Sequence, residues 1–101
     1  MLVTIDNKKY DVKFGRQRVE VPEYVKRKDV FNTFCKVSMV DDTKKGRDRF
    51  QEVALGEAKQ SVKDRYNKIV GKKIAMGRAV KGFPRDKRKI FWETFLDNFD
   101  V

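Results

Sequence analysis

The sequence contains no histidine and only one cysteine among its 101 residues. Without an imidazole, a Ser-His-Asp triad, a Cys-His pair and the usual zinc sites are excluded. The single Cys35 cannot form an internal disulfide, which fits a reducing compartment. The carboxylates lie mostly beside lysines and arginines rather than in apolar surroundings that would raise their pKa for acid–base work. We therefore expect a binding protein rather than an enzyme, with no metal and no cofactor.

Long hydrophobic runs are also missing. No stretch approaches the roughly 20 apolar residues that a membrane-spanning helix needs, and the first 14 residues lack the apolar core of a signal peptide. We expect a protein that stays in the cytoplasm and does not enter a membrane. With 40% hydrophobic and 40% charged residues, the chain should fold as a single domain over residues 1–101, strand-rich in 1–60 and helical and basic in 61–101.

The N-terminal segment predicts a β-hairpin. Apolar and polar residues alternate on both sides of Asp6 and Asn7, and these two residue types tolerate the positive φ of a tight primed turn. Gly15 is expected to end the second strand. An irregular charged loop should follow, with a short strand over Arg18–Val21.

Alternation resumes over Thr33–Val40 and predicts a further strand. The polar segment Asp41–Arg49 then reads as a turn, and Phe50–Ala58 as a weaker strand in which Gly56 marks a bulge or a close approach of backbones. The N-terminal part is thus predicted to be a meander of about four antiparallel strands.

The first predicted helix has a start and a stop signal. Ser61 and Asp64 have the spacing of a capping box, which places the first helical residue at Val62. Gly82 is expected to adopt a left-handed conformation at the C-terminal end, and Pro84 cannot continue the helix.

A second helix is predicted from residue 84 or 85 to Asn98. Its apolar residues recur at helical spacing, so the aromatic stripe is interpreted as core rather than as a ligand site. These residues are Ile90, Phe91, Trp92, Phe95, Leu96 and Phe99. The expected fold class is α+β, an antiparallel sheet of about four strands followed by two C-terminal helices packed on it.

The positive charge is concentrated in the two-helix unit. Residues 59–89 hold twelve Lys or Arg and two acids, whereas the remaining 70 residues hold thirteen of each sign. Like charges one helical turn apart repel by a few tenths of a kcal/mol per pair, and a solvated surface normally mixes the signs. An anionic partner is therefore favoured over simple solubility.

The first helix combines two unfavourable choices. Gly71 and Gly77 each cost about 1 kcal/mol relative to alanine in a helix interior, and Lys73 falls on the face that carries Ile69, Val70, Ile74 and other apolar residues. One interpretation is a pocket beside Gly77 with the Lys73 ammonium at its end. The other is that Lys73 extends to solvent while Gly77 admits a strand. The remaining cations flank this face, with Arg65, Lys68 and Lys72 on one side and Lys63, Arg78 and Lys81 on the other.

Two familiar phosphate or DNA motifs do not fit. The GKK triplet at residues 71–73 lacks the first glycine and the Ser/Thr of a Walker A loop. The two helices could form a helix-turn-helix, but the second helix is mainly a core stripe with acidic residues toward its end, so it is weak as a recognition helix.

The C-terminal part resembles a small-protein family common in phages and prophages. The resemblance lies in KDRYNKIVGKKIAMGRAVKGFPRDKRKIFWETF, and the N-terminal IDNKKY hairpin agrees with it. The matching helical positions are Lys63, Asp64, Tyr66, Asn67, Lys68, Gly71, Lys72, Lys73, Ile74, Ala75, Arg78, Ala79, Pro84, Arg85, Arg88 and Trp92. The chain departs from the family pattern at Asn7, Lys72 and Ser61-Val62.

That family is similar to the phage anti-defence proteins that counter the Thoeris system by sequestering a cyclic ADP-ribose-type signal without cleaving it. The resemblance implies a viral protein in the cytoplasm of an infected bacterial cell, assembled as a homo-oligomer with pockets between subunits. It also implies that Asn67 and Arg85 meet the ribose and phosphates, and that Tyr66 or Phe50 stacks against the base.

The candidate ligand-binding residues all lie in the two-helix unit. They are Tyr66, Asn67, Lys68, Lys72, Lys73, Arg78, Arg85 and Arg88. The first hypothesis is capture of an anionic small nucleotide. The second is a basic host-takeover protein that binds nucleic acid or inhibits a nucleic-acid-associated enzyme such as a CRISPR nuclease, and the third is an interaction module for another partner. A strong salt dependence would separate the second hypothesis from the first.

Overall fold

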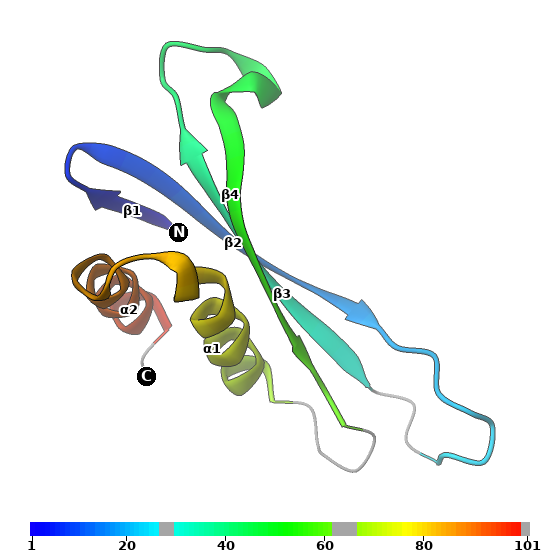
Figure 1. The fold of residues 1–101 in the computed structure, drawn as a ribbon. Coiled ribbons are helices and arrows are strands. Elements are labelled where there is room, and N and C mark those ends of the chain that lie inside the picture. The colour runs from blue at the N-terminus through cyan, green and yellow to red at the C-terminus, as the bar shows by residue number, and fades with distance from the viewer. Residues whose placement is uncertain (27–29, 62–66, 100–101) are drawn as a thin grey trace.

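Four antiparallel strands form one sheet in the order β1-β2-β3-β4, and two helices cover one of its faces (Figure 1). The structure is a computed structural model that describes residues 1–26, 30–61 and 67–99. The predicted α+β class and the order of strands before helices are confirmed. The elements are β1 (Leu2–Ile5), β2 (Lys8–Arg18), β3 (Phe31–Val40), the 3₁₀ turn η1 (Gly46–Arg49), β4 (Phe50–Lys59), α1 (Lys68–Ala79), the 3₁₀ turn η2 (Val80–Gly82) and α2 (Arg85–Phe99).

The β1–β2 hairpin closes as predicted. Asp6 and Asn7 have φ angles of 51° and 65°, the pair of positive values that a primed two-residue turn requires. The predicted end of β2 at Gly15 is wrong, because β3 continues beside it and pairs Gly15 with Phe34 and Arg18 with Phe31. A long partner strand therefore outweighs the weak strand preference of a single glycine.

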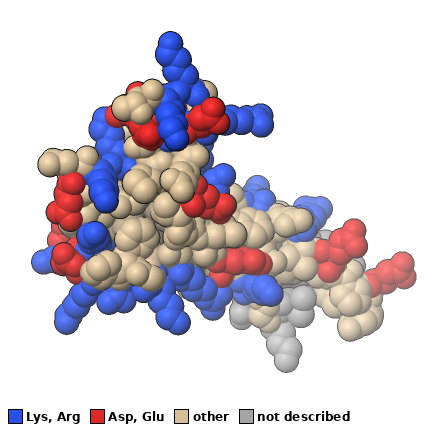
Figure 2. All heavy atoms as spheres, turned by 45° about the horizontal axis from the view of Figure 1, so that its top comes forward, with Lys and Arg blue, Asp and Glu red and all other residues tan. Residues whose placement is uncertain are grey.

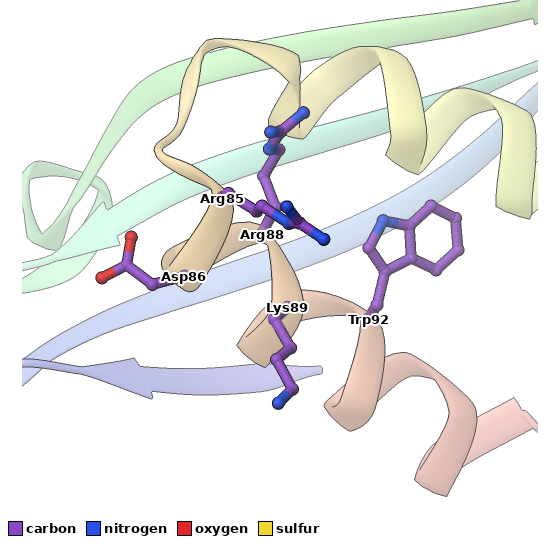
Figure 3. A pocket seen from close by; sticks show the side chains of 5 residues that line it. All are labelled: Arg85, Asp86, Arg88, Lys89 and Trp92. Carbon is purple, nitrogen blue, oxygen red and sulfur yellow. The ribbon is translucent and has the colours of Figure 1, made fainter.

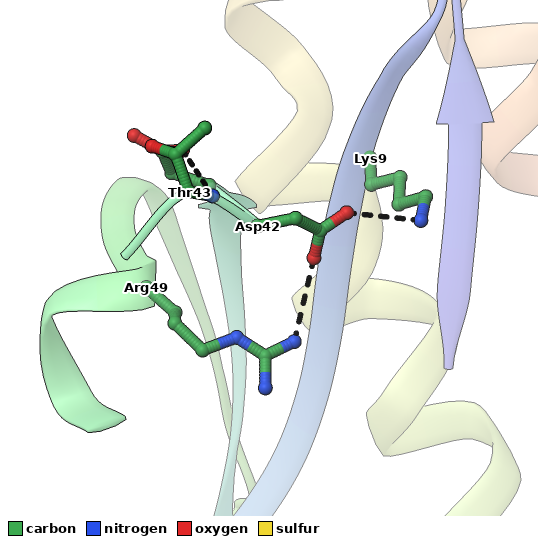
Figure 4. A network of polar contacts seen from close by, with 5 residues as sticks. Lys9, Asp42, Thr43 and Arg49 are labelled. Carbon is green, nitrogen blue, oxygen red and sulfur yellow. Dashed lines mark hydrogen bonds and ion pairs between the residues drawn. The ribbon is translucent and has the colours of Figure 1, made fainter. Parts of the chain in front are cut away.

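The β3–β4 connection is held by short polar contacts (Figure 4). The Asp41 carboxylate accepts hydrogen bonds from the hydroxyl and the backbone N–H of Thr43, at 2.6 and 3.0 Å. Asp42 accepts a hydrogen bond from Lys9 on β2 at 3.0 Å and another from Arg49 at 3.5 Å. The Thr43 hydroxyl lowers the pKa of Asp41 and the Lys9 ammonium lowers that of Asp42. This turn is thus tied to the neighbouring strand β2.

Helix α1 lies very close to β4. A Cβ atom added at Gly56 would overlap the carbonyl oxygen of Ala75 and the backbone nitrogen of Ala79, and would lie 3.0 Å from the Ala79 Cα. The close approach predicted at Gly56 is confirmed. The irregularity of the strand pairing lies elsewhere, between Val37 and Ser38 of β3.

The buried face of α1 agrees with the predicted one only in part, because Met76 and Val80 were expected on it and are buried. Ala75, Met76 and Ala79 are buried, whereas Val70 and Ile74 are 48% and 43% exposed. The prediction followed the bulkiest apolar side chains, but the backbone contact at Gly56 admits only small residues on the helix face that meets β4. The helix is therefore rotated relative to its expected orientation.

Helix α1 begins at Lys68, because Asn67 has an extended backbone and its Oδ1 accepts hydrogen bonds from the N–H groups of Ile69 and Val70, both at 3.1 Å. Asp64 of the predicted capping box and the predicted start at Val62 lie outside the described residues. The expected left-handed Gly82 is wrong, since Gly82 belongs to the 3₁₀ turn η2 and Gly46 is the one glycine with positive φ among the described residues.

Helix α2 covers β1 and β2 with aromatic rings. Phe91 and Phe95 are completely buried and stack edge-to-face on Tyr10 and Phe14 of β2, with ring centroids 5.7 Å apart in each pair. The predicted core stripe is confirmed at these two positions, whereas Leu96 is 42% exposed. In the described parts of the chain, no helix has the length and apolar composition needed to cross a bilayer.

Candidate anion-binding site

The structure divides the predicted site residues into two clusters. Arg85 and Arg88 lie in the first turns of α2, and Lys68 and Lys72 lie along α1 beside β2. Each cluster lines its own concavity, and the two concavities share no lining residue. The single basic surface predicted from the sequence is therefore two separate candidate sites.

The larger concavity, here named the α2 hollow, is lined by Arg85, Asp86, Arg88, Lys89 and Trp92 and has a volume of about 940 Å³ (Figure 3). It is open to solvent along one side of α2. In Figure 3 the Asp86 carboxylate points away from the Trp92 ring, and the two arginine side chains lie on the side of the helix that carries the ring. Three cationic side chains, the Asp86 carboxylate and the Trp92 indole thus line the hollow, and Lys89 extends away from the arginines and the ring.

Arg88 lines this hollow and has one unsatisfied donor. Its Nε atom is buried and has no hydrogen-bond partner among the described residues. Leaving a buried donor unpaired costs about 1–3 kcal/mol. A guanidinium pairs best with the oxygens of a carboxylate or a phosphate. Lys89 forms a loose ion pair with Glu93 at 3.9 Å, with both side chains largely exposed, which contributes little.

Trp92 gives the hollow an aromatic surface. The indole is partly buried and contacts Phe95 edge-on, with centroids 5.8 Å apart. On the α1 side, a Cβ added at Gly77 would lie 3.5 Å from the Trp92 ring. This is an ordinary van der Waals distance, so a methyl group at position 77 would pack against the indole without a clash. Lys73 is exposed and lines neither concavity, which favours the interpretation in which it extends to solvent, whereas Gly77 faces Trp92 rather than a strand.

The second concavity, here named the two-lysine cleft, has a volume of about 310 Å³. It is lined by Phe14, Gly15, Arg16, Thr33, Lys68 and Lys72. The Lys72 Nζ lies 4.3 Å from the centroid of the Phe99 ring and 5.4 Å from that of Phe14. Partial burial, and then the nearby Lys68 ammonium, lower the pKa of Lys72 below its usual 10.5.

The remaining candidate residues have other surroundings. The side-chain Oδ1 of Asn67 caps α1, and Arg78 donates a hydrogen bond to the backbone carbonyl of Glu57 at 2.6 Å. Phe50 pairs with Val40 on the sheet face opposite the helices, with Lys13 and Arg49 over its ring at 5.2 and 5.5 Å. Within one subunit it therefore lies on the other side of the sheet from Arg85. Tyr66 lies outside the described residues.

Catalytic groups are scarce in the part of the chain that the structure describes. Residues 1–26, 30–61 and 67–99 contain no group of three or more acidic, Cys or His side chains that could hold a metal ion. Burial raises the pKa of the Cys35 thiol to about 12, so it stays protonated at neutral pH and is a poor nucleophile. The chemistry that the two concavities offer is hydrogen bonding, charge pairing and stacking.

Sequence reasoning missed Trp92 and Lys89 as lining residues of the α2 hollow. Trp92 was assigned to the aromatic stripe, which marks core positions and does not show which side chains remain at the surface. Lys89 was counted only among the cations of residues 59–89. The spacing contained a usable signal, because Arg88 and Lys89 precede Trp92 by four and three residues and so share a helix face with it. Comparisons of this chain with protein-family models, with curated proteins and with solved structures found no match.

Proposed function

We propose that this chain binds a nucleotide-type anion in the α2 hollow and holds it without chemical conversion. The observation that carries the proposal is the buried Nε of Arg88, which lacks an acceptor among the described residues and lies in the same hollow as the Trp92 indole. A phosphate oxygen in the hollow would pair with the Arg88 guanidinium, and a base would pack on the exposed part of the ring.

The chemistry of the hollow matches the two ends of a nucleotide. Arg85 and Arg88 would donate charge-assisted hydrogen bonds to phosphate oxygens, worth about 1.5–3 kcal/mol each. Stacking of a base on an aromatic side chain adds about 1–3 kcal/mol. Asp86 points away from the ring and so would not oppose an anion placed between Trp92 and the arginines.

The biological role that we propose follows the family resemblance. A viral protein that captures a cyclic ADP-ribose-like signal in the cytoplasm of an infected bacterium would silence a defence system by sequestration alone. Such a protein needs donors, cations and one stacking surface but no proton-transfer group. Assembly as a homo-oligomer is part of this proposal, because a partner subunit could close the open side of the α2 hollow.

Calorimetric titration with cyclic ADP-ribose and with AMP tests this function. Arg88→Gln should weaken binding at least about tenfold, the loss expected for one charge-assisted hydrogen bond. Lys81→Gln is the matched control, since it removes one exposed positive charge from the neighbouring turn η2 and should change the affinity less than about twofold. Equal affinities in the wild type and Arg88→Gln would contradict the proposal.

Nucleic-acid binding is the second candidate function, and the spread of cations favours it. Lys73, Lys81 and Lys89 are exposed outside or at the rim of the α2 hollow, and Figure 2 shows Lys and Arg side chains projecting along the lower edge of the view. If the chain contacts about six phosphates of a duplex, the logarithm of the binding constant should fall with the logarithm of the salt concentration with a slope near −5. Gel shifts on random-sequence duplex DNA at several salt concentrations measure this slope, and a weak dependence would favour the small nucleotide.

A further inference from the structure

The two-lysine cleft is separate from the α2 hollow and has a different construction. It lies between the first turns of α1 and the part of β2 that continues past Phe14, and no residue of α2 lines it. Its volume of about 310 Å³ is at the lower end of the range for ligand pockets. A compact ligand would therefore fill it.

Within residues 1–26, 30–61 and 67–99, no carboxylate neutralises the two lysines of the cleft. Lys68 and Lys72 are one turn apart on α1, and among the described residues neither forms an ion pair. Two ammonium groups at this spacing repel each other. The Lys72 ammonium is further held near the rings of Phe14 and Phe99, which limits the positions that it can adopt. Its charge is thus fixed at the cleft rather than dispersed in solvent.

A neutral donor is placed beside the lysines at a cost to the helix. Thr33 on β3 lines the cleft and is only 4% exposed. A Cβ added at Gly71 would lie 2.6 Å from the Thr33 Oγ1, so the glycine in the middle of α1 leaves the space that this hydroxyl occupies. Gly71 destabilises the helix by comparison with alanine. A glycine is nevertheless required at this position, because a Cβ would displace the Thr33 hydroxyl that lies beside Lys72.

We propose that the two-lysine cleft is a second binding site, specific for the phosphoryl group of a small molecule. Lys68 and Lys72 donate to two of its oxygens, and the Thr33 hydroxyl donates to a third or to the same oxygen as Lys72. The small volume suits inorganic phosphate or the phosphate of a nucleoside monophosphate, and the Phe14 ring then contacts the group attached to it. The site does not depend on the nucleotide proposed for the α2 hollow.

The proposal is tested by NMR titration of the ¹⁵N-labelled full chain at low salt with inorganic phosphate and, separately, with AMP. Saturable shifts are expected at Thr33, Lys68 and Lys72. Lys72→Gln should weaken this binding about tenfold. Lys73→Gln is the matched control, because it makes the same change at the next, exposed position of α1 and should leave the affinity within about twofold.

Two further variants make the result decisive. Thr33→Val replaces the hydroxyl by a methyl group of similar size and should weaken phosphate binding at least about threefold. If Lys72→Gln does not fold, Lys68→Gln measures the same loss of phosphate affinity at the other lysine. Arg88→Gln should leave binding in the two-lysine cleft unchanged, which separates this proposal from that for the α2 hollow.

Three results would overturn the inference. One is an equal loss of affinity in Lys72→Gln and Lys73→Gln, which would indicate general charge attraction. Another is the absence of saturable shifts at Thr33 and Lys72 with either probe. The third is binding of these residues to a short oligonucleotide but to neither small probe, which would assign the cleft to a nucleic-acid backbone.

Discussion

Helix α1 meets β4 through glycine and alanine, whereas α2 meets β1 and β2 through aromatic rings. At the first interface, Gly56 lies against the backbone of Ala75 and Ala79. At the second, Phe91 and Phe95 fill the space between the helix and the sheet. One interface depends on the absence of side chains and the other on large ones, so the two should respond in opposite ways to a change in side-chain size.

Adding atoms at Gly56 should have the largest effect. In Gly56→Val the new side chain would overlap the backbone of α1, which cannot move aside as a flexible side chain could. We expect a loss of unfolding free energy above about 5 kcal/mol, or no folded protein. Urea denaturation followed by circular dichroism measures it.

Gly15→Val is the matched control for this change. Gly15 also lies within a strand, but a Cβ there has no heavy atom within 4 Å and its φ is not positive. The free energy of unfolding should stay within about 1 kcal/mol of the wild type. If both variants lose stability equally, the loss reflects strand glycines in general rather than the contact with α1.

Removing atoms from the aromatic interface should have the next largest effect. Phe95→Ala leaves a cavity against Phe14 and Trp92 and should cost about 3–5 kcal/mol. The adjacent Leu96→Ala, at a position 42% exposed, should cost less than about 1 kcal/mol. Thermal and urea unfolding of both variants test this, and similar losses would mean that α2 is not seated as described.

The smallest effect on stability is expected at Lys72 of α1, whose ammonium lies near Phe14 of β2 and Phe99 of α2. Because the pKa of Lys72 is lowered in the folded protein, folding disfavours its protonated form. The penalty is present at neutral pH and disappears as the pH rises through the lowered pKa toward the unfolded value of 10.5. The wild type should therefore gain stability relative to Lys72→Met over this alkaline range.

Unfolding free energies measured at a series of alkaline pH values give that comparison. Lys73→Met keeps Lys72 and should follow the wild-type profile. A constant difference between the wild type and Lys72→Met at every pH would show that the Lys72 ammonium is not desolvated beside Phe14 and Phe99.

The elements of the fold were largely predictable, because their signals are local. The Asp6-Asn7 turn, the alternation over Thr33–Val40 and the aromatic stripe of α2 each specify one element through neighbouring residues. The orientation of α1 could not be predicted, since it depends on Gly56, which is distant in the sequence. A pattern that ranks side chains by hydrophobicity favours Ile74 over Ala75 for the buried face, whereas a glycine on the opposing strand favours the reverse.

The sequence predicted which segment carries the excess positive charge, but it did not predict how the charged residues are divided between two concavities. The excess of cations in residues 59–89 drew attention to Arg85, Arg88 and Lys72, which line the two concavities. Their division between two concavities depends on the position of β2 beside α1, which no local pattern contains. Lys73 was selected because it falls among apolar residues, and it is exposed because those residues are not the buried ones.

Arg78 has a consequence for how copies of this protein meet at high concentration. Strand β4 is at the edge of the sheet, and an edge strand offers backbone groups to which a foreign strand can add. The Arg78 guanidinium already occupies the carbonyl of Glu57 on that strand and carries a charge that an incoming chain would have to desolvate. A strand that adds at Glu57 would have to displace this cation, which disfavours edge-to-edge pairing at that point of β4.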